Sequence, residues 1–219
     1  MATRQVLAEL AAAWQAQGGE PLAVDSVGGV DAARRVLDGE AFDVVFLASD
    51  AIDRLQAAGR VAAGSKVDLM LSSTAAAVRA GAALPDIASE DAVRAAVLAA
   101  PSIGYSTGPS GVALQKLFER WGIAEQIQPR LMQARPGVPV GSMVASGEVA
   151  LGFQQLSELI HVPGIAIVGT LPAAIAIDTI FSAGVVAGSP RADAARRLLA
   201  LMAAPQAADA KRRQGMEPL

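Results

Sequence analysis

The sequence predicts a mixed α/β protein built from two lobes, each a three-layer α/β/α arrangement. Apolar segments of strand length alternate with segments of helix length, a pattern typical of sheets covered by helices on both faces. Two long extended stretches, residues 66–79 and 175–187, interrupt that alternation. We expect these stretches to be crossover strands, so that residues 1–78 and 180–219 form lobe I and residues 79–179 form an inserted lobe II.

Capping residues and chain breakers set the bounds of the predicted helices. Thr3 is a candidate N-cap for the first helix, which Gly18 ends, and Asp50 and Ser89 open two later helices. The full set of predicted helices covers residues 3–16, 30–37, 50–59, 89–99, 112–121, 139–146, 155–160 and 190–215. Pro205 is expected to break the last of them.

The predicted strands are short and mostly apolar. Residues 43–48 form a continuous apolar run, as expected for a strand buried on both faces, and the repeated strand–helix–strand units predict a largely parallel sheet. The other predicted strands are residues 22–27, 102–106, 130–134, 149–154 and 165–168. A sheet of this kind usually begins with a strand, whereas this chain begins with a helix. Either the fold lacks its first strand or the chain starts upstream of Met1, and we expect the second.

Composition excludes several classes of function. The chain of 219 residues is 53% hydrophobic and 18% charged, which excludes a disordered protein. Its net charge of −3 and its 4% of aromatic residues argue against nucleic-acid binding. There is no cysteine and only one histidine, His161, which excludes disulfides, thiolate sites and zinc sites built from several histidines. We therefore expect no cofactor and no bound metal ion.

The chain also argues against membrane insertion. The longest uncharged run, residues 159–177, contains Pro163, Gly164, Gly169 and Pro172, which indicate turns between short strands. No signal-peptide pattern opens the chain. This predicts a cytoplasmic protein as the sequence is written, and a periplasmic one if the chain starts upstream.

Four junctions place small or polar residues directly before a helix. Each could be an ordinary cap, but helix N-termini also bind anions through free N–H groups, and glycines allow a ligand to approach the backbone. The junctions are residues 1–3, 26–29, 106–111 and 154–155, and the first crossover adds hydroxyl groups at residues 72–74 and Arg79 at its end. The candidate ligand-binding residues are Ala2, Thr3, Val27, Gly28, Ser72, Thr74, Arg79, Ser106, Gly108, Ser110, Gly111, Gln154 and Gln155.

Familiar catalytic and nucleotide-binding motifs are missing. The loop at residues 106–111 lacks the spacing of a P-loop, no GxGxxG follows a predicted strand, and no GxSxG elbow accompanies His161. These absences argue against nucleotide binding and against hydrolase chemistry. Arg79 could bind a carboxylate through its guanidinium group or simply extend into solvent.

In their order and spacing, several segments resemble a type II solute-binding protein of the molybdate-binding kind. The segments are residues 26–29, 42–50, 67–79, 106–111, 147–154 and 165–170. The resemblance implies two lobes that close over an oxyanion, with ligand roles for Ala2, Thr3, Val27, Gly28, residues 72–74, and Gln154 or Gln155. Molybdate binders tend to have a tyrosine where the glutamine pair falls. That pair and residues 78–81 are more similar to the branch with aconitate isomerase-like proteins, which implies a small carboxylate as ligand.

Three functions remain open. The first is a protein that binds a small anion in an interlobe cleft, with an ABC permease as its partner. The second is an isomerase of a small di- or tricarboxylate, which needs a general base; Glu148, Glu158 and Asp178 are the candidates. The missing signal peptide favours the isomerase over a transport receptor. The third is a cytosolic sensor or an orphan domain with an unknown ligand.

Overall fold

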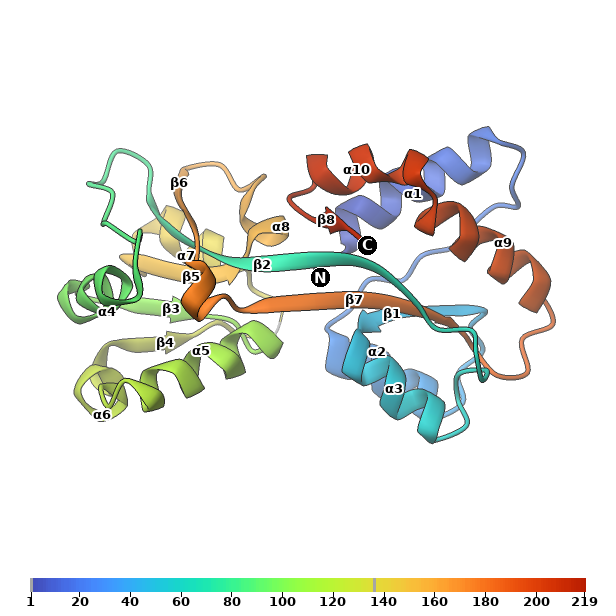
Figure 1. Ribbon diagram of the computed structural model, residues 1–219, viewed down its shortest axis with the longest axis horizontal. Helices are drawn as coiled ribbons and strands as arrows, with labels where there is room; N and C mark the ends of the chain where they lie inside the picture. The colour runs from blue at the N-terminus through green and yellow to red at the C-terminus, as the bar shows by residue number, and fades with distance from the viewer. Residues whose placement is uncertain (1, 136) are drawn as a thin grey trace. The chain divides into compact units, whose positions relative to one another are not determined.

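The computed structural model describes residues 2–135 and 137–219 and divides the chain into two compact units. Unit 1 consists of Met1–Ser72 and Thr179–Leu219, and unit 2 consists of Ser73–Asp178. The chain leaves unit 1 within strand β2 (Val67–Arg79) and re-enters it at the start of strand β7 (Asp178–Val185). The mixed α/β fold is as predicted, and both extended stretches form strands (Figure 1).

Unit 1 is a sheet with helices on both faces. Strand β1 (Val44–Ala48) pairs antiparallel with β7, and the short β8 (Glu217–Pro218) pairs antiparallel with the first part of β2. One face carries α2 (Gly29–Leu37) and α3 (Ser49–Ala57) over a core that includes Leu47, Ile52 and Leu55. The helices on the other face, visible in Figure 1, are α1 (Arg4–Ala16), α9 (Ala192–Ala203) and α10 (Ala208–Arg213), with the 3₁₀ turn η3 (Pro205–Ala207) between the last two.

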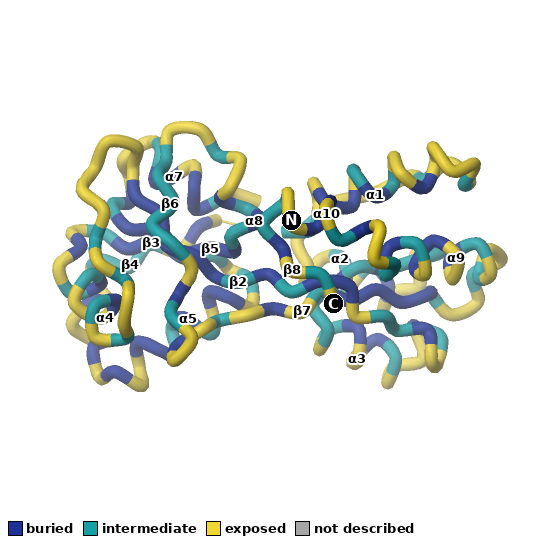
Figure 2. Tube along the Cα trace, turned by 45° about the horizontal axis from the view of Figure 1, so that its top comes forward, coloured by how far each residue is buried: buried dark blue, intermediate teal, exposed yellow. Residues whose placement is uncertain are grey.

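Unit 2 is built around strand β3 (Ile103–Tyr105). It pairs in parallel with β4 (Leu131–Gln133) and β5 (Leu151–Gln155), and β2 pairs antiparallel with β5 and with β6 (Ile165–Thr170). One face carries α4 (Glu90–Ala99), α5 (Pro109–Arg120), α6 (Ala124–Ile127) and the 3₁₀ turns η1 (Gln128–Arg130) and η2 (Ala173–Ile175). The other face carries α7 (Val140–Ser146) and α8 (Leu156–Leu159). Figure 2 shows β3 and β5 buried throughout, whereas the loop at residues 80–84 is exposed.

Glycine allows α7 to lie directly on the sheet of unit 2. A Cβ added to Gly152 of β5 would lie 2.5 Å from Val144 Cγ2 and 2.9 Å from Val140 Cγ1, too close for any side chain. The face of β5 that contains Gly152 therefore contacts α7, and side chains that alternate with Gly152 point to the opposite face. This assignment decides where the two glutamines at the end of β5 point.

The structure corrects four predictions. Residues 22–27 do not form a strand, because no neighbouring strand pairs with them and most are exposed. The sheet is not largely parallel. Strand β7 pairs antiparallel with β1 in unit 1, and β2 pairs antiparallel with β8 in unit 1 and with β5 and β6 in unit 2. Strand β1 is not buried on both faces, since only Val45 and Leu47 are fully covered. Asp50 does not cap α3, which begins at Ser49; it lies in the first turn and pairs with Arg54 at 2.6 Å.

Most of the predicted helices are present. Ser89 caps α4 by accepting a hydrogen bond from the Ala92 N–H at 3.2 Å, and Gly18 ends α1 with a φ of 80°. Pro205 separates α9 from α10 as predicted. Within the described part of the chain, no helix is both long and apolar enough to cross a membrane.

Candidate functional site

The turn between β3 and α5 holds a compact group of small polar residues in unit 2. Gly108 is the N-cap of α5 with an extended backbone, and Pro109 occupies the first helical position. The Ser106 and Ser110 hydroxyl oxygens lie 3.1 Å apart and share a hydrogen bond. A Cβ at Gly111 would lie 1.8 Å from the Ser106 carbonyl oxygen, so only glycine lets the helix start this close to the strand.

This turn presents main-chain donors. Pro109 has no N–H, and the N–H groups of Gly111 and Val112 donate to the Gly108 carbonyl at 3.0 and 3.2 Å. Among the described residues, the N–H groups of Thr107, Gly108 and Ser110 find no main-chain acceptor. They lie at the positive end of the α5 dipole, so the turn can bind the oxygens of an anion without a basic side chain.

The two glutamines that end β5 point to opposite faces of the sheet. Gln154 lies on the same face as Gly152 and is buried; its Oε1 accepts from the Val140 N–H at 2.8 Å, and its Nε2 donates to Glu158 Oε2 at 2.8 Å. Its side-chain amide therefore caps α7. Gln155 points to the face of Phe153 and pairs in register with Thr74 of β2.

Thr74 has a buried hydroxyl group that lacks a hydrogen-bond partner among the described residues. Its side chain is 1% exposed, and its Oγ1 makes no hydrogen bond to any described residue. The main chain around it is fully engaged, since Thr74 N donates to the Ile177 carbonyl at 2.9 Å and its carbonyl accepts from Leu171 N at 3.0 Å. An unsatisfied buried hydroxyl costs about 1–3 kcal/mol, and a ligand oxygen could remove that cost.

These groups meet at one edge of the unit 2 sheet. Strands β3 and β5 run in parallel with Tyr105 opposite Phe153, so their carboxyl ends, at Ser106 and Gln155, lie on the same edge. The antiparallel β2 brings Thr74 to that edge by its pairing with Gln155. We call Thr74, Ser106, Gly108, Ser110 and Gln155 the β3–β5 edge cluster.

Arg79 does not join the β3–β5 edge cluster. It ends β2 five residues after Thr74, pairs with Ile165 and is exposed, and Ala77 is already opposite Gly152 near the start of β5. Its guanidinium group therefore belongs to the opposite edge of the unit 2 sheet.

The remaining candidates lie in unit 1. Thr3 precedes α1 and its carbonyl accepts from the Leu7 N–H at 2.9 Å, but its side chain makes no capping bond; Ala2 beside it is half-buried, and Met1 lies outside the described residues. Gly28 is the N-cap of α2 and follows the half-buried Val27. Ser72 is fully buried in β2.

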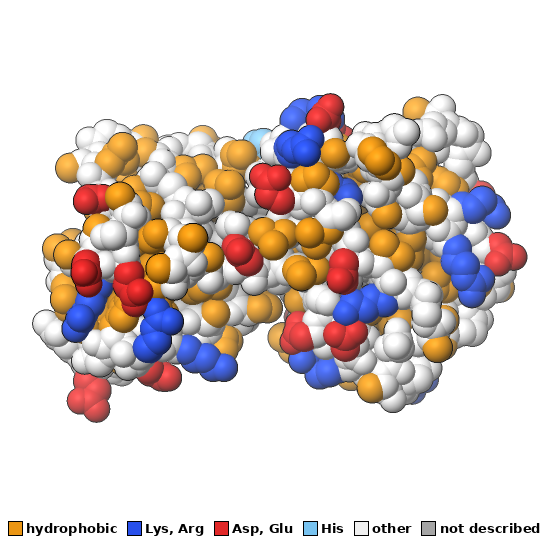
Figure 3. Space-filling model, in the orientation of Figure 1, with side chains coloured by type: hydrophobic (Ala, Val, Ile, Leu, Met, Phe, Trp, Pro, Cys, Tyr) orange, Lys and Arg blue, Asp and Glu red, His pale blue; other side chains and the backbone are white. Residues whose placement is uncertain are grey.

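Side-chain contacts that the sequence did not reveal hold the loop before α2. Arg35 of α2 reaches back to Asp25 Oδ2 at 2.9 Å, also pairs with Glu40, and lies 4.9 Å from the centre of the Phe42 ring. Asp25 is the residue before Ser26, so Arg35 ties the start of the 26–29 junction to its own helix. Charge pairs recur over the surface in Figure 3, where basic and acidic side chains lie side by side.

The structure distinguishes the three carboxylates named as candidate bases. Glu148 and Asp178 are exposed. Glu158 is half-buried in α8, and burial raises the pKa of its carboxyl group, an effect that the hydrogen bond from Gln154 opposes.

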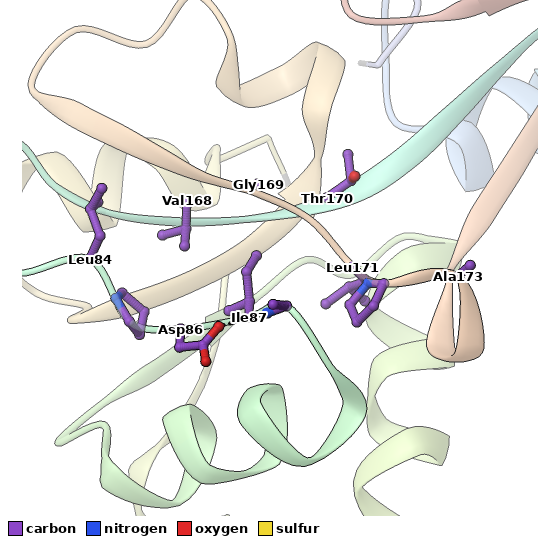
Figure 4. Close-up of a pocket in the computed structure, with 11 residues that line it drawn as sticks. Leu84, Asp86, Ile87, Val168, Gly169, Thr170, Leu171 and Ala173 are labelled. Atoms are coloured by element: carbon purple, nitrogen blue, oxygen red, sulfur yellow. Dashed lines mark hydrogen bonds between the residues drawn. The ribbon is translucent and has the colours of Figure 1, made fainter.

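One groove in unit 2 contains none of the predicted ligand residues. It has a volume of about 670 Å³ and lies between residues 84–88 and residues 168–173 (Figure 4). Its lining is mostly apolar, Ile87 points toward Gly169 of β6, and Asp86 is its one charged side chain. The lining contains no basic side chain to offset the charge of Asp86, so we do not take this groove as the candidate anion site.

Comparison with known proteins agrees with this arrangement of strands and helices. A model of the family described as bacterial extracellular solute-binding protein matches residues 1–217. The chain belongs to this family. The predicted resemblance to type II solute-binding proteins is therefore confirmed.

Individual relatives of this solute-binding protein differ in their names. An aconitate isomerase from Pseudomonas sp. is 42% identical over 186 residues, which are 84% of this chain and 71% of that protein. The periplasmic molybdate-binding protein of Azotobacter vinelandii has a TM-score of 0.79 at 21% identity, covering 98% of this chain and 94% of its own. A sulfate-binding protein from Mycobacterium tuberculosis has a TM-score of 0.73 at 20% identity, and the match covers 100% of this chain and 83% of that protein. At these identities the two solved structures show a shared fold.

Proposed function

We propose that this solute-binding protein holds a small anion, of the carboxylate class, at the β3–β5 edge cluster of unit 2. The observation that carries the proposal is the buried Thr74 hydroxyl, which has no partner among the described residues and lies opposite Gln155 in register. A protein retains an unsatisfied buried hydroxyl at a cost, and such groups concentrate at binding sites.

The donors around Thr74 suit an anion. The Thr74, Ser106 and Ser110 hydroxyls and the main-chain N–H groups at the start of α5 are neutral donors, and the N–H groups lie at the positive end of the α5 dipole. The Gln155 amide adds a planar side-chain group to the cluster, and the relative named aconitate isomerase supports a carboxylate over a metal oxyanion. Gln154 is left out, because both ends of its amide are already bonded.

Unit 1 offers a second set of donors of the same kind. We include Ala2, Thr3, Val27, Gly28 and Ser72 in the proposal as residues that contribute main-chain N–H or hydroxyl groups. The lobe assignment of residues 1–78 with 180–219 and residues 79–179 is part of the same proposal. Structural relatives named as transporter components support an ABC permease as partner, and the family description supports a place outside the cytoplasm.

The test is substitution of Thr74 by valine, which keeps the shape of the side chain and removes the hydroxyl. Binding of cis-aconitate, citrate, succinate, sulfate, molybdate and tungstate is measured by isothermal titration calorimetry, with thermal unfolding as a second measurement. We expect Thr74→Val to weaken binding about tenfold, equivalent to 1.4 kcal/mol, and to leave the ligand-free protein at least as stable as the wild type.

The matched control is Thr170→Val, the same chemical change at an exposed position of β6 in the same unit. Thr170 lines the groove of Figure 4, so this variant also tests the groove as an alternative site. Equal affinities of Thr74→Val and wild type for every ligand that binds would refute the proposed site.

A second function is favoured by the 42% identity to an aconitate isomerase. An isomerase converts the anion that it binds, so the site would need a general base beside the donors. Incubation of the protein with cis-aconitate and detection of trans-aconitate by NMR distinguishes a catalyst from a receptor that only binds.

A further inference from the structure

Glu158 is the carboxylate whose position in unit 2 best suits proton transfer. Strand β5 ends at Gln155 and α8 starts with the next residue, so the main chain of Glu158 lies within one helical turn of Gln155, at about 1.5 Å of rise per residue, while its carboxylate lies beside Gln154 on the α7 face at the carboxyl end of β5. Gln154 Nε2 donates to Glu158 Oε2 at 2.8 Å, and Gln154 is itself fixed by the Val140 N–H. The carboxylate is therefore anchored to β5 and α7 and does not swing freely in solvent.

The alternatives are placed less well. Glu148 precedes β5 and so lies at the amino end of that strand, on the edge opposite the cluster, and it is exposed. Asp178 is exposed at the start of β7. Burial raises the pKa of Glu158, and a carboxylate with a raised pKa is a stronger base toward a C–H proton.

We propose that Glu158 is the general base with which this site moves a proton within an unsaturated di- or tricarboxylate. The proposal rests on the proposed carboxylate binding at the β3–β5 edge cluster and adds a catalytic residue to it. Glu158 contacts the carbon chain of the ligand, while the hydroxyl and N–H donors hold its carboxylate groups.

The proposed step is a 1,3-proton shift. A C–H bond of the CH₂ group next to the double bond breaks, its proton forms an O–H bond with Glu158, and its electron pair spreads over the C=C bond and the conjugated carboxylate. The O–H bond of Glu158 then breaks, and the proton forms a new C–H bond at the far carbon of the former double bond. The double bond has moved by one position, Glu158 is a carboxylate again, and no other reactant is consumed. The donors at the start of α5 stabilise the negative charge that develops on the ligand carboxylate.

The test compares wild type, Glu158→Gln and Glu148→Gln as full-length chains with cis-aconitate in D₂O. ¹H NMR follows both the formation of trans-aconitate and the exchange of the CH₂ protons for deuterium, and calorimetry measures binding. We expect Glu158→Gln to bind within about threefold of the wild type but to lose isomerisation and exchange by at least about 100-fold, the usual size of a general-base contribution. Glu148→Gln is expected to behave as the wild type.

Glutamine at position 158 can still accept the hydrogen bond from Gln154, and an unfolding curve checks that the variant folds. A second variant, Glu158→Asp, keeps the carboxylate and shortens the side chain, so it should exchange protons more slowly than wild type and faster than Glu158→Gln. Unchanged rates in Glu158→Gln, or exchange in Glu158→Asp as slow as in Glu158→Gln, would overturn the assignment. A wild type that binds cis-aconitate without exchange or isomerisation would overturn it while leaving the binding function intact. Absence of binding for every anion tested would remove both proposals.

Discussion

At the scale of single residues, the turn at the start of α5 depends on Gly111. A Cβ there would lie 1.8 Å from the Ser106 carbonyl oxygen; the carbonyl belongs to the main chain and the Cβ is fixed to it, so neither can rotate away. The same contact fixes the spacing between Ser106 and Ser110, whose hydroxyls share a hydrogen bond at 3.1 Å. Gly111, which has no side chain to bind a ligand, therefore sets the positions of the Ser106 and Ser110 hydroxyls.

We predict that Gly111→Ala lowers the free energy of unfolding by about 2 kcal/mol or more, because α5 must shift away from β3. Gly108→Ala is the matched comparison for stability, since a Cβ at Gly108 would lie 3.7 Å from Ser106 Oγ, an ordinary contact, and its φ of −79° suits alanine. Chemical denaturation of both variants checks the difference. Equal losses of stability in the two would contradict the close approach at Gly111.

Single residues also mark the limit of prediction from sequence. The junction at residues 106–111 is visible in the sequence because serine, threonine and glycine gather before a helix. The sequence does not show which of Gln154 and Gln155 faces α7. Alternation along a strand predicts that the two side chains point to opposite faces, but not which face contacts the helix. The position of Gly152 under α7 decides that question, and it is a tertiary contact. The burial of Glu158 likewise appears only once α8 packs against the sheet.

At the scale of elements, α1 and α10 are joined by polar contacts between segments about two hundred residues apart in sequence, a separation at which side-chain pairing cannot be foreseen from spacing. Arg213 donates to Glu9 Oε1 from Nε at 3.0 Å, and Gln214 Nε2 donates to Glu9 Oε2 at 3.1 Å. The hydrogen bond from Arg213 lowers the pKa of Glu9, and partial burial opposes that effect.

We predict that Glu9 stabilises unit 1 in a pH-dependent manner. Its pKa is lower in the folded state than in the unfolded state, so its contribution is present above the unfolded pKa, near 4.5, and is lost as pH falls through the folded value. The free energy of unfolding should therefore be lower for Glu9→Gln than for wild type at pH 7, and the difference should shrink toward zero below pH 4. Urea denaturation over that range measures it.

The control for this prediction is Asp193→Asn, which removes an exposed pair with Arg196 within α9. The Asp193 side chain is 90% exposed, and such pairs contribute little to stability. A pH-dependent loss in Asp193→Asn as large as that in Glu9→Gln would show that general surface charge, and not the contact between α1 and α10, is responsible.

Elements with local signals are predictable from this sequence and elements without them are not. The N-cap Ser89 marks the start of α4 and Gly18 marks the end of α1, so both helix boundaries can be predicted from the sequence. Residues 22–27 have the composition of a strand but no partner strand, because pairing is decided by the rest of the fold. Strand β8 is two residues long and exists only because β2 is beside it.

At the scale of the whole molecule, the fold separates the parts that hold the structure from those that hold a ligand. The cores of both units consist of apolar side chains beneath helices, whereas most of the proposed ligand donors lie at strand ends and helix starts, and Ser72 and Thr74 lie within β2, where the chain passes from unit 1 to unit 2. A ligand bound at such a place stabilises the folded chain by mass action, even though it adds little to either core.

We therefore predict that a carboxylate present at about 100 times its Kd raises the free energy of unfolding by about 2.7 kcal/mol. In hydrogen–deuterium exchange monitored by mass spectrometry, the bound carboxylate should slow amide exchange at residues 107–112 and 155–159, because the donors of α5 and the start of α8 flank the proposed ligand. At the same ligand concentration, the exchange of Thr74→Val should slow less than that of the wild type at both segments. Slowing confined to residues 84–88 and 168–173 would instead place the ligand in the groove of Figure 4 and contradict the assignment to the β3–β5 edge cluster.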